Sequence, residues 1–177
     1  QFAHFDIAVL GISIIDLKWK LNSFLPKDIS INKIHLAYET CHSRFDAINR
    51  KYIYRIHLQK DPFCIDNSFY FRKELDLRLM NKAAKILLLN TNYQCFSKIK
   101  TEVNNFQCHI ELAEWKEIGS HMEFNIVANR FLRGMVRAIV GTLLEIGQGR
   151  KSIIDFQEII DSKDRRKAGS AAKAHGL

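Results

Sequence analysis

The sequence predicts an α+β fold, in which strands joined as hairpins form a sheet and helices are segregated from them. Residues 106–115 and 121–128 are two alternating segments joined at Gly119 and Ser120, as is typical of an antiparallel hairpin. Segments with helical periodicity precede and follow this hairpin. Hairpin strands with segregated helices favour an α+β fold over a doubly wound parallel sheet.

The N-terminal part of the chain is expected to contain one helix and two strands. Residues 12–24 have helical periodicity and stop before Pro26, because the residue preceding a proline disfavours the α region. Residues 29–38 and 51–58 alternate as strands do. Residues of the second strand point alternately to two faces. One face carries Tyr52, Tyr54, Ile56 and Leu58, and the other face carries basic residues. Residues 61–72 are expected to be an irregular loop.

The C-terminal part is expected to contain three helices around the hairpin. Residues 76–89 form the first, residues 129–147 the second and residues 152–162 the third. A basic tail, residues 163–177, ends the sequence. The hairpin leads directly into the helix of residues 129–147, which makes that helix the natural neighbour of the sheet.

The predicted helix of residues 129–147 has two unlike faces. One is an apolar stripe, Leu132, Met135, Val136, Ile139, Leu143 and Ile146. The other carries Arg130, Arg133 and Arg137 beside the small residues Gly134, Ala138 and Gly141. Each glycine costs a helix about 1 kcal/mol, so we expect another group to approach this face closely, and guanidiniums suit phosphate or carboxylate. The alternative is a solvated basic face whose glycines make room for a neighbouring element.

Composition points to a polyanionic partner. The chain has 177 residues, 47% hydrophobic and 26% charged, with a net charge of +8 and a pI of about 9.4. Such a length can bury a real core, and such a charge favours nucleic acid first. No apolar run reaches the roughly 18 residues of a membrane span, which predicts no membrane association.

The cysteines suggest neither a metal site nor a disulfide framework. Cys41, Cys64, Cys95 and Cys108 have no CxxC spacing and no paired histidine motif. They are interpreted as reduced thiols of a cytoplasmic protein. Both chain ends look cut, because the sequence opens without Met on the apparent end of a strand and closes without a cap. We therefore expect an internal piece of a longer protein.

Five motifs, in order along the chain, resemble the TruA family of tRNA pseudouridine synthases. They are QFAHFD (residues 1–6), LPKDI (25–29), RFDAINRKYIYRI (44–56), NRFLRGMVRAIVG (129–141) and DRRKAGSAAKAHGL (164–177). The resemblance implies that uridine is isomerised to pseudouridine at positions 38–40 of the anticodon stem-loop of tRNA, without cofactor or metal. The implied fold has two α/β lobes on an antiparallel sheet with flanking helices, in a homodimer. Residues 1–40 would then be the remainder of the N-terminal lobe and residues 41–177 the C-terminal lobe.

The resemblance also assigns roles to individual residues. Arg137 matches the arginine that pairs with the catalytic aspartate, and Tyr52 matches the tyrosine that packs against the target uracil. The expected RNA-binding residues are His42, Ser43, Arg44, Phe45, Lys98, Lys100, Arg130 and Arg133. The family's nucleophilic Asp lies in a motif that would precede Gln1, and Asp6 does not match it. The 177 residues alone are therefore expected to be inactive.

Two other classes of function are compatible with the residues alone. The strand of Tyr52 and Tyr54 could be a stacking platform of a non-catalytic RNA-binding module. The helix face with arginines and glycines could instead dock a protein, in a structural or dimerisation piece. Strong weakening of tRNA binding by salt would separate RNA binding from protein docking, because phosphate contacts are salt-dependent.

Overall fold

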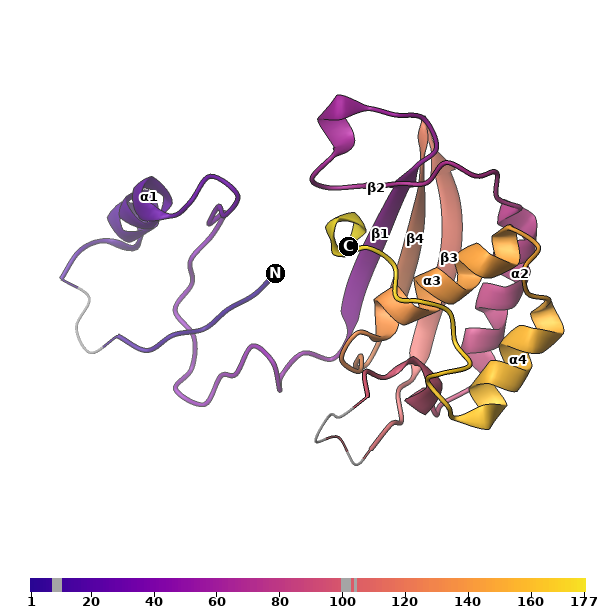
Figure 1. Cartoon of the computed structure of the whole chain (residues 1–177). Helices are drawn as coiled ribbons and strands as arrows, with labels where there is room; N and C mark the ends of the chain where they lie inside the picture. The colour runs from indigo at the N-terminus through magenta and orange to yellow at the C-terminus, as the bar shows by residue number, and fades with distance from the viewer. Residues whose placement is uncertain (8–10, 100–102, 104) are drawn as a thin grey trace. The chain divides into compact units, whose positions relative to one another are not determined.

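The protein consists of two compact units, Gln1–Ala47 and Ile48–Leu177, called here the smaller and the larger unit (Figure 1). The structure is a computed structural model, and it describes residues 1–7, 11–99, 103 and 105–177. The assignment of residues 1–40 and 41–177 to two lobes of a larger protein stays a prediction.

Among the described residues of the smaller unit, the regular element is helix α1, Ile14–Phe24. Ser13 caps its N-terminus, because its hydroxyl accepts a hydrogen bond from the backbone N–H of Asp16 at 3.1 Å. The helix ends at Phe24, with Leu25 as its C-cap before Pro26, as the sequence predicts. None of the helix residues is buried.

The strand predicted at residues 29–38 is wrong, since these residues have no regular secondary structure. A strand needs a neighbouring backbone to pair with, and here a side chain takes that place. The Asn22 side chain accepts a hydrogen bond from the backbone N–H of Ile31 at 2.7 Å and donates one to its carbonyl at 2.9 Å. Alternation of apolar residues alone could not reveal this competitor.

The larger unit contains a four-stranded sheet in the order β2-β1-β4-β3. Its strands are β1 (Arg50–His57), β2 (Phe69–Tyr70), β3 (Ile110–Ile118) and β4 (His121–Ala128). Strands β3 and β4 form the predicted hairpin, with Gly119 in its turn at a φ of 59°. Such a positive φ favours glycine, because it has no Cβ. Strand β1 pairs antiparallel with β4, so that Tyr54 lies opposite Phe124.

The predicted irregular loop at residues 61–72 is wrong in part. Its residues Pro62–Cys64 form a 3₁₀ turn, and its residues Phe69–Tyr70 form β2, which pairs parallel with β1. The sheet is therefore mixed rather than purely antiparallel. A two-residue strand carries no periodic signal, so its sequence could not distinguish it from the loop around it.

Three helices lie on one side of this sheet, where the last of them packs against the first (Figure 1). They are α2 (Leu77–Ile86, continued by a 3₁₀ turn at Leu87–Leu89), α3 (Met135–Gly147) and α4 (Ile153–Ser162). The N-terminus of α2 is capped by the Asp76 side chain, and α4 begins with a capping box between Ser152 and Asp155. The core contains many fully buried side chains from the strands, the helices and the connections between them, and among them are Tyr54, Tyr93, Phe96, Phe124, Phe156, Met135, Ile139 and Leu143.

The helix predicted over residues 129–147 is wrong at its N-terminal end, because α3 begins at Met135. Gly134 has a φ of 76°, which an α-helix cannot contain, and it occupies the N-cap position. Lys98 donates a backbone hydrogen bond to the carbonyl of Arg133 at 2.9 Å. The preceding residues, 129–133, therefore form a connection from β4 rather than a helical turn.

The apolar stripe of that prediction is confirmed even where the helix is not. Its six members, including Leu132 ahead of the helix, are all buried. The three arginines have no such common face, because only Arg137 belongs to α3. The periodicity thus located the core correctly but extended the helix through a glycine turn.

Candidate active site

The C-terminal segment of residues 168–173, called here the strap, passes against α3. A Cβ added to Gly141 would lie 1.8 Å from the carbonyl oxygen of Ser170, which is far inside contact distance. A Cβ added to Gly169 would in turn lie 3.0 Å from the Cα of Thr142. The two glycines let two backbones touch. The close approach expected at the small residues of this helix is confirmed at Gly141, and the approaching group is a neighbouring element of the chain, as the alternative interpretation has it.

Arg137 is bound to the strap through two hydrogen bonds. Its Nε donates to the carbonyl oxygen of Ala172 at 2.6 Å, and its own carbonyl accepts from the N–H of Ala172 at 2.9 Å. The side chain is half-buried. Among the described residues, no carboxylate lies within ion-pair distance of Arg137. Its guanidinium therefore keeps donors for another acceptor.

Two tyrosines of β1 lie on the face that meets this helix. Tyr54 is buried, and its hydroxyl donates to the carbonyl oxygen of Lys173 at 2.7 Å. Burial raises the pKa of Tyr54 well above its ordinary value, while the nearby positive charge of Arg137 lowers it in part. Two residues earlier on the same face, Tyr52 is 38% exposed and meets Phe131 edge to face, with ring centroids 5.2 Å apart.

This arrangement brings a cation and an accessible aromatic ring to one region of the larger unit. Residues two apart on a strand are separated by about 7 Å. Tyr52 therefore lies about that far along β1 from Tyr54, whose pKa is lowered in part by the charge of Arg137. A half-buried guanidinium can hold a carboxylate ionised. An accessible aromatic ring can stack on a base through its face. The resemblance predicted roles for both residues. Tyr54, which the alternative of an RNA-binding module placed beside Tyr52 on a stacking platform, is buried and bonded to the strap instead.

The other predicted basic residues of the larger unit lie outside α3. Arg133 is exposed in the turn before the helix, and Arg130 is half-buried in the connection from β4. The charge of Arg130 lowers the pKa of the Cys108 thiol, although burial of that thiol raises it by more. Lys98 is exposed beside the turn of Arg133, to which its backbone is bonded. Lys100 lies outside the described residues, as do Glu102 and Asn104 of the same loop.

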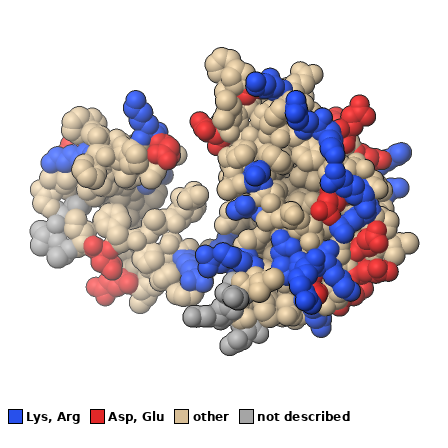
Figure 2. All heavy atoms as spheres, in the orientation of Figure 1, with Lys and Arg blue, Asp and Glu red and all other residues tan. Residues whose placement is uncertain are grey.

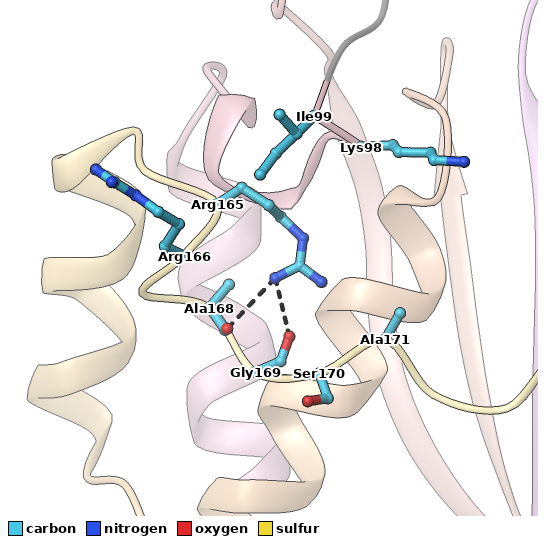
Figure 3. Close-up of a pocket in the computed structure, with 8 residues that line it drawn as sticks. All are labelled: Lys98, Ile99, Arg165, Arg166, Ala168, Gly169, Ser170 and Ala171. Atoms are coloured by element: carbon cyan, nitrogen blue, oxygen red, sulfur yellow. Dashed lines mark hydrogen bonds between the residues drawn. The ribbon is translucent and has the colours of Figure 1, made fainter.

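A basic hollow of about 520 Å³ lies between the Lys98 loop and the strap (Figure 3). It is lined by Lys98, Ile99, Arg165, Arg166 and residues 168–171. The Arg165 Nη1 donates to the carbonyl oxygens of Ala168 at 3.3 Å and Gly169 at 3.0 Å, and Arg166 forms an ion pair with Asp164 at 2.7 Å. The sequence marked this region only as a basic tail. In the orientation of Figure 2, Lys and Arg side chains gather on the viewed face where the strap passes.

The predicted RNA-binding residues of the smaller unit form a compact turn. The Nδ1 of His42 accepts the backbone N–H groups of Arg44 and Phe45, both at 3.2 Å, and its ring lies 4.2 Å from that of Phe45. Ser43 bonds the ring of His4 at 2.9 Å, and Arg44 lies over the exposed ring of Phe45 at 5.5 Å. The turn presents an aromatic ring with a guanidinium above it, a combination suited to nucleic acid.

Within the described ranges, the chain brings together no group of three His, Cys, Asp or Glu residues that could hold a metal ion. All four cysteines are free thiols, with Cys95 and Cys108 buried and Cys41 exposed. None of the helices in the described part is long and apolar enough to cross a bilayer.

The sequence of the chain matches one family of known proteins. A family model described as tRNA pseudouridine synthase matches residues 83–177, which include α3 and the strap. A protein of Parabacteroides distasonis named tRNA pseudouridine synthase A is 44% identical over 177 residues, covering 100% of this chain and 70% of the relative. Its namesake from Porphyromonas gingivalis is 44% identical over 160 residues, covering 89% of this chain and 64% of that protein.

A more distant relative supports the same assignment. The tRNA pseudouridine synthase A of Bacillus subtilis is 34% identical over 179 residues, which cover 100% of this chain and 72% of that protein. The similarity therefore extends over both units and beyond any single motif. With this identity and coverage, the chain belongs to the TruA family of tRNA pseudouridine synthases, which are isomerases.

Proposed function

We propose that the full-length protein converts uridine to pseudouridine at positions 38–40 of the anticodon stem-loop of tRNA. The observation that carries the proposal is Arg137, a half-buried guanidinium fixed by the strap, with donors left over and an exposed tyrosine on the neighbouring strand. The family supplies the reaction class, and the relatives' names supply tRNA. The positions within tRNA come from the resemblance of the five sequence motifs.

In this proposal Arg137 and Tyr52 act on different parts of the reaction. The bond between N1 of uracil and C1′ of the ribose breaks, and C5 then bonds to C1′, while C5 loses a proton and N1 gains one. Arg137 keeps the attacking aspartate ionised and oriented. Tyr52 packs against the uracil that has been flipped from its stack, and its hydroxyl assists the transfer of the C5 proton. The reaction needs no oxidant, because product and substrate are isomers.

The remaining predicted residues would hold the tRNA backbone. Lys98, Arg130 and Arg133 lie on connections of the larger unit, where cations can reach phosphates. His42, Ser43, Arg44 and Phe45 would make a second contact from the smaller unit. We include Lys100 on sequence grounds alone. A homodimer in the cytoplasm completes the proposal.

The test compares Arg137→Ala with Arg78→Ala in the full-length protein. Arg78 is an exposed arginine of α2 and serves as the matched control. We expect Arg137→Ala to lose pseudouridine formation by at least about 100-fold in single turnover while it keeps tRNA affinity within about threefold, because its partner is a carboxylate rather than phosphate. Equal turnover in the two variants would refute the catalytic role of Arg137.

We also propose that residues 1–177 alone make no pseudouridine. The family's nucleophilic aspartate belongs to a motif that this sequence does not contain. Asp46 has a structural task instead, since its carboxylate accepts the backbone N–H of His42 at 2.7 Å. Release of tritium from tRNA labelled at C5 of uridine measures the reaction directly. Release at the rate of the full-length protein would show that the nucleophile lies within these residues.

A further inference from the structure

Hydrogen bonds from the sheet and from α3 hold the strap on both sides of Ala172, the residue that binds the Arg137 side chain. We infer that Thr142 and Tyr54 are positioning residues, which set the direction of the Arg137 guanidinium through the strap. The inference rests on the proposed role of Arg137 and adds to it two residues that do not touch the substrate. It also specifies which edge of the guanidinium receives the catalytic carboxylate.

The Nε of Arg137 is already occupied. It donates to the carbonyl oxygen of Ala172 at 2.6 Å, a short bond for a charged donor. A guanidinium binds a carboxylate in two bidentate ways, either through Nε and one Nη or through both Nη atoms. The first is blocked here by the Ala172 carbonyl. The partner carboxylate must therefore meet the edge formed by the two Nη atoms, and the position of Ala172 decides where that edge points.

Thr142 holds the strap on the side before Ala172. Its side chain is fully buried in α3, and its hydroxyl donates to the carbonyl of Ala138 at 2.8 Å. Because the hydroxyl hydrogen is engaged there, its lone pair faces the N–H of Gly169, which donates to it at 2.9 Å. Valine has the same shape and cannot accept that bond. Arg165 supports the same end from outside through the carbonyls of residues 168 and 169.

Tyr54 holds the strap on the side after Ala172. Its hydroxyl donates to the carbonyl of Lys173 at 2.7 Å, one residue beyond the carbonyl that Arg137 uses. The ring is buried, and a Cβ added to Gly176 would lie 2.5 Å from it, so the segment after the strap also packs on this ring. Ala172 is thus fixed from both directions, and Arg137 takes its orientation from a fixed acceptor.

The test uses Thr142→Val, Thr142→Ser and Tyr54→Phe in the full-length protein, at a temperature where thermal unfolding shows every variant to be folded. A misplacement of about 1 Å at a reacting group costs on the order of 100-fold in rate. We expect Thr142→Val to slow single-turnover pseudouridine formation by about 10- to 100-fold with the Kd for tRNA within about twofold. Thr142→Ser keeps the hydroxyl and should restore the rate to within about threefold. Tyr54→Phe should slow the reaction without changing the Kd.

A second readout follows Arg137 itself. In protein carrying ¹⁵N-labelled arginine, the Nε–H of Arg137 should exchange slowly with solvent, because it is bonded to Ala172, and Thr142→Val should speed this exchange at least about fivefold. Arg137→Ala assigns the signal. If Thr142→Val kept both the wild-type turnover and the wild-type exchange rate, the inference would be overturned. If Thr142→Val does not fold, wild-type turnover of Tyr54→Phe would overturn it instead.

The inference and the proposed function fail in different ways. If Arg137→Ala is inactive while Thr142→Val and Tyr54→Phe are fully active, only the positioning role is overturned. Active Arg137→Ala would overturn the proposed catalytic role of Arg137, whatever the exchange rates show. Arg78→Ala, outside the site, should match the wild type in every assay.

Discussion

Replacing Gly141 by alanine tests the contact between α3 and the strap most directly. In a solvent-exposed helix this change stabilises by up to about 1 kcal/mol, because alanine has the higher helix propensity. Here the new Cβ would lie 1.8 Å from the Ser170 oxygen and 2.9 Å from its carbonyl carbon, where ordinary contact begins near 3.4 Å. Both atoms belong to the backbone, so no side-chain rotation can relieve the overlap. The strap would have to move by roughly 1.6 Å, the difference between ordinary contact and this separation.

The expected cost follows from what that movement breaks. Bonds of the strap to Thr142, Arg137 and Tyr54 would lengthen, each worth about 1 kcal/mol, and overpacking of a close-packed site costs about 1–3 kcal/mol. Weakening of these bonds adds to the overpacking cost, and after the gain of about 1 kcal/mol in helix propensity we expect the free energy of unfolding to fall by about 2–5 kcal/mol.

Urea denaturation of the full-length protein, followed by circular dichroism, measures this change. Gly11→Ala is the control, because a Cβ there would meet nothing within 4 Å. We expect that variant to unfold close to the wild-type midpoint. If Gly141→Ala were instead more stable than wild type by about 1 kcal/mol, helix propensity alone would account for it and the strap could not lie where the structure has it.

Three further predictions concern single side chains. Arg133→Ala should weaken tRNA binding and lower the slope of log K against log salt concentration by about one, and an unchanged slope would assign Arg133 to solvent. Tyr52→Phe should keep tRNA affinity but slow single-turnover product formation, whereas a normal rate would leave it a stacking role only. Burial raises the pKa of Cys95 to about 12, so at pH 8 it stays a thiol and should resist iodoacetamide while the exposed Cys41 reacts, as mass spectrometry of the modified peptides would show. Equal labelling of both in native protein would contradict that burial.

The sequence could predict those helices and strands in which the spacing of apolar residues repeats several times. The hairpin β3–β4 and the last helix, with Ser152 at its cap, follow from pattern and capping chemistry. Gly134 shows where periodicity fails as a predictor. The apolar period extends through this glycine, but its positive φ excludes it from the helix, which begins only at the next residue. Asn22 shows another such failure, because a side-chain amide satisfied the backbone at Ile31 where a strand partner was expected.

The candidate site divides in the same way. Arg137 and Tyr52 belong to motifs that the sequence shows. The small residue Gly141 predicted that another group would approach the helix closely, and the structure has such a contact. What touches it could not be predicted from the sequence, because each of these bonds joins a side chain of α3 to a backbone group of the strap about 30 positions away, and the residue types of the strap do not encode such a partner. Thr142 and Tyr54 supply the hydroxyls for two of the bonds to this segment, but the sequence alone does not show which distant backbone group each hydroxyl meets.

The pairing of β1 with β4 also bears on how the chain folds as it is made. About 60 residues separate the two strands, and synthesis at about 5–20 residues per second delays the second by roughly 3–12 seconds. During that interval the aromatic face of β1 has neither its central neighbour nor α3 to cover it. A nascent chain in this state is a natural client for a chaperone that shields apolar strands. A ribosome pause between residues 58 and 120 would lengthen the exposure and should lower the yield of folded protein, whereas a pause after residue 147 should cost much less.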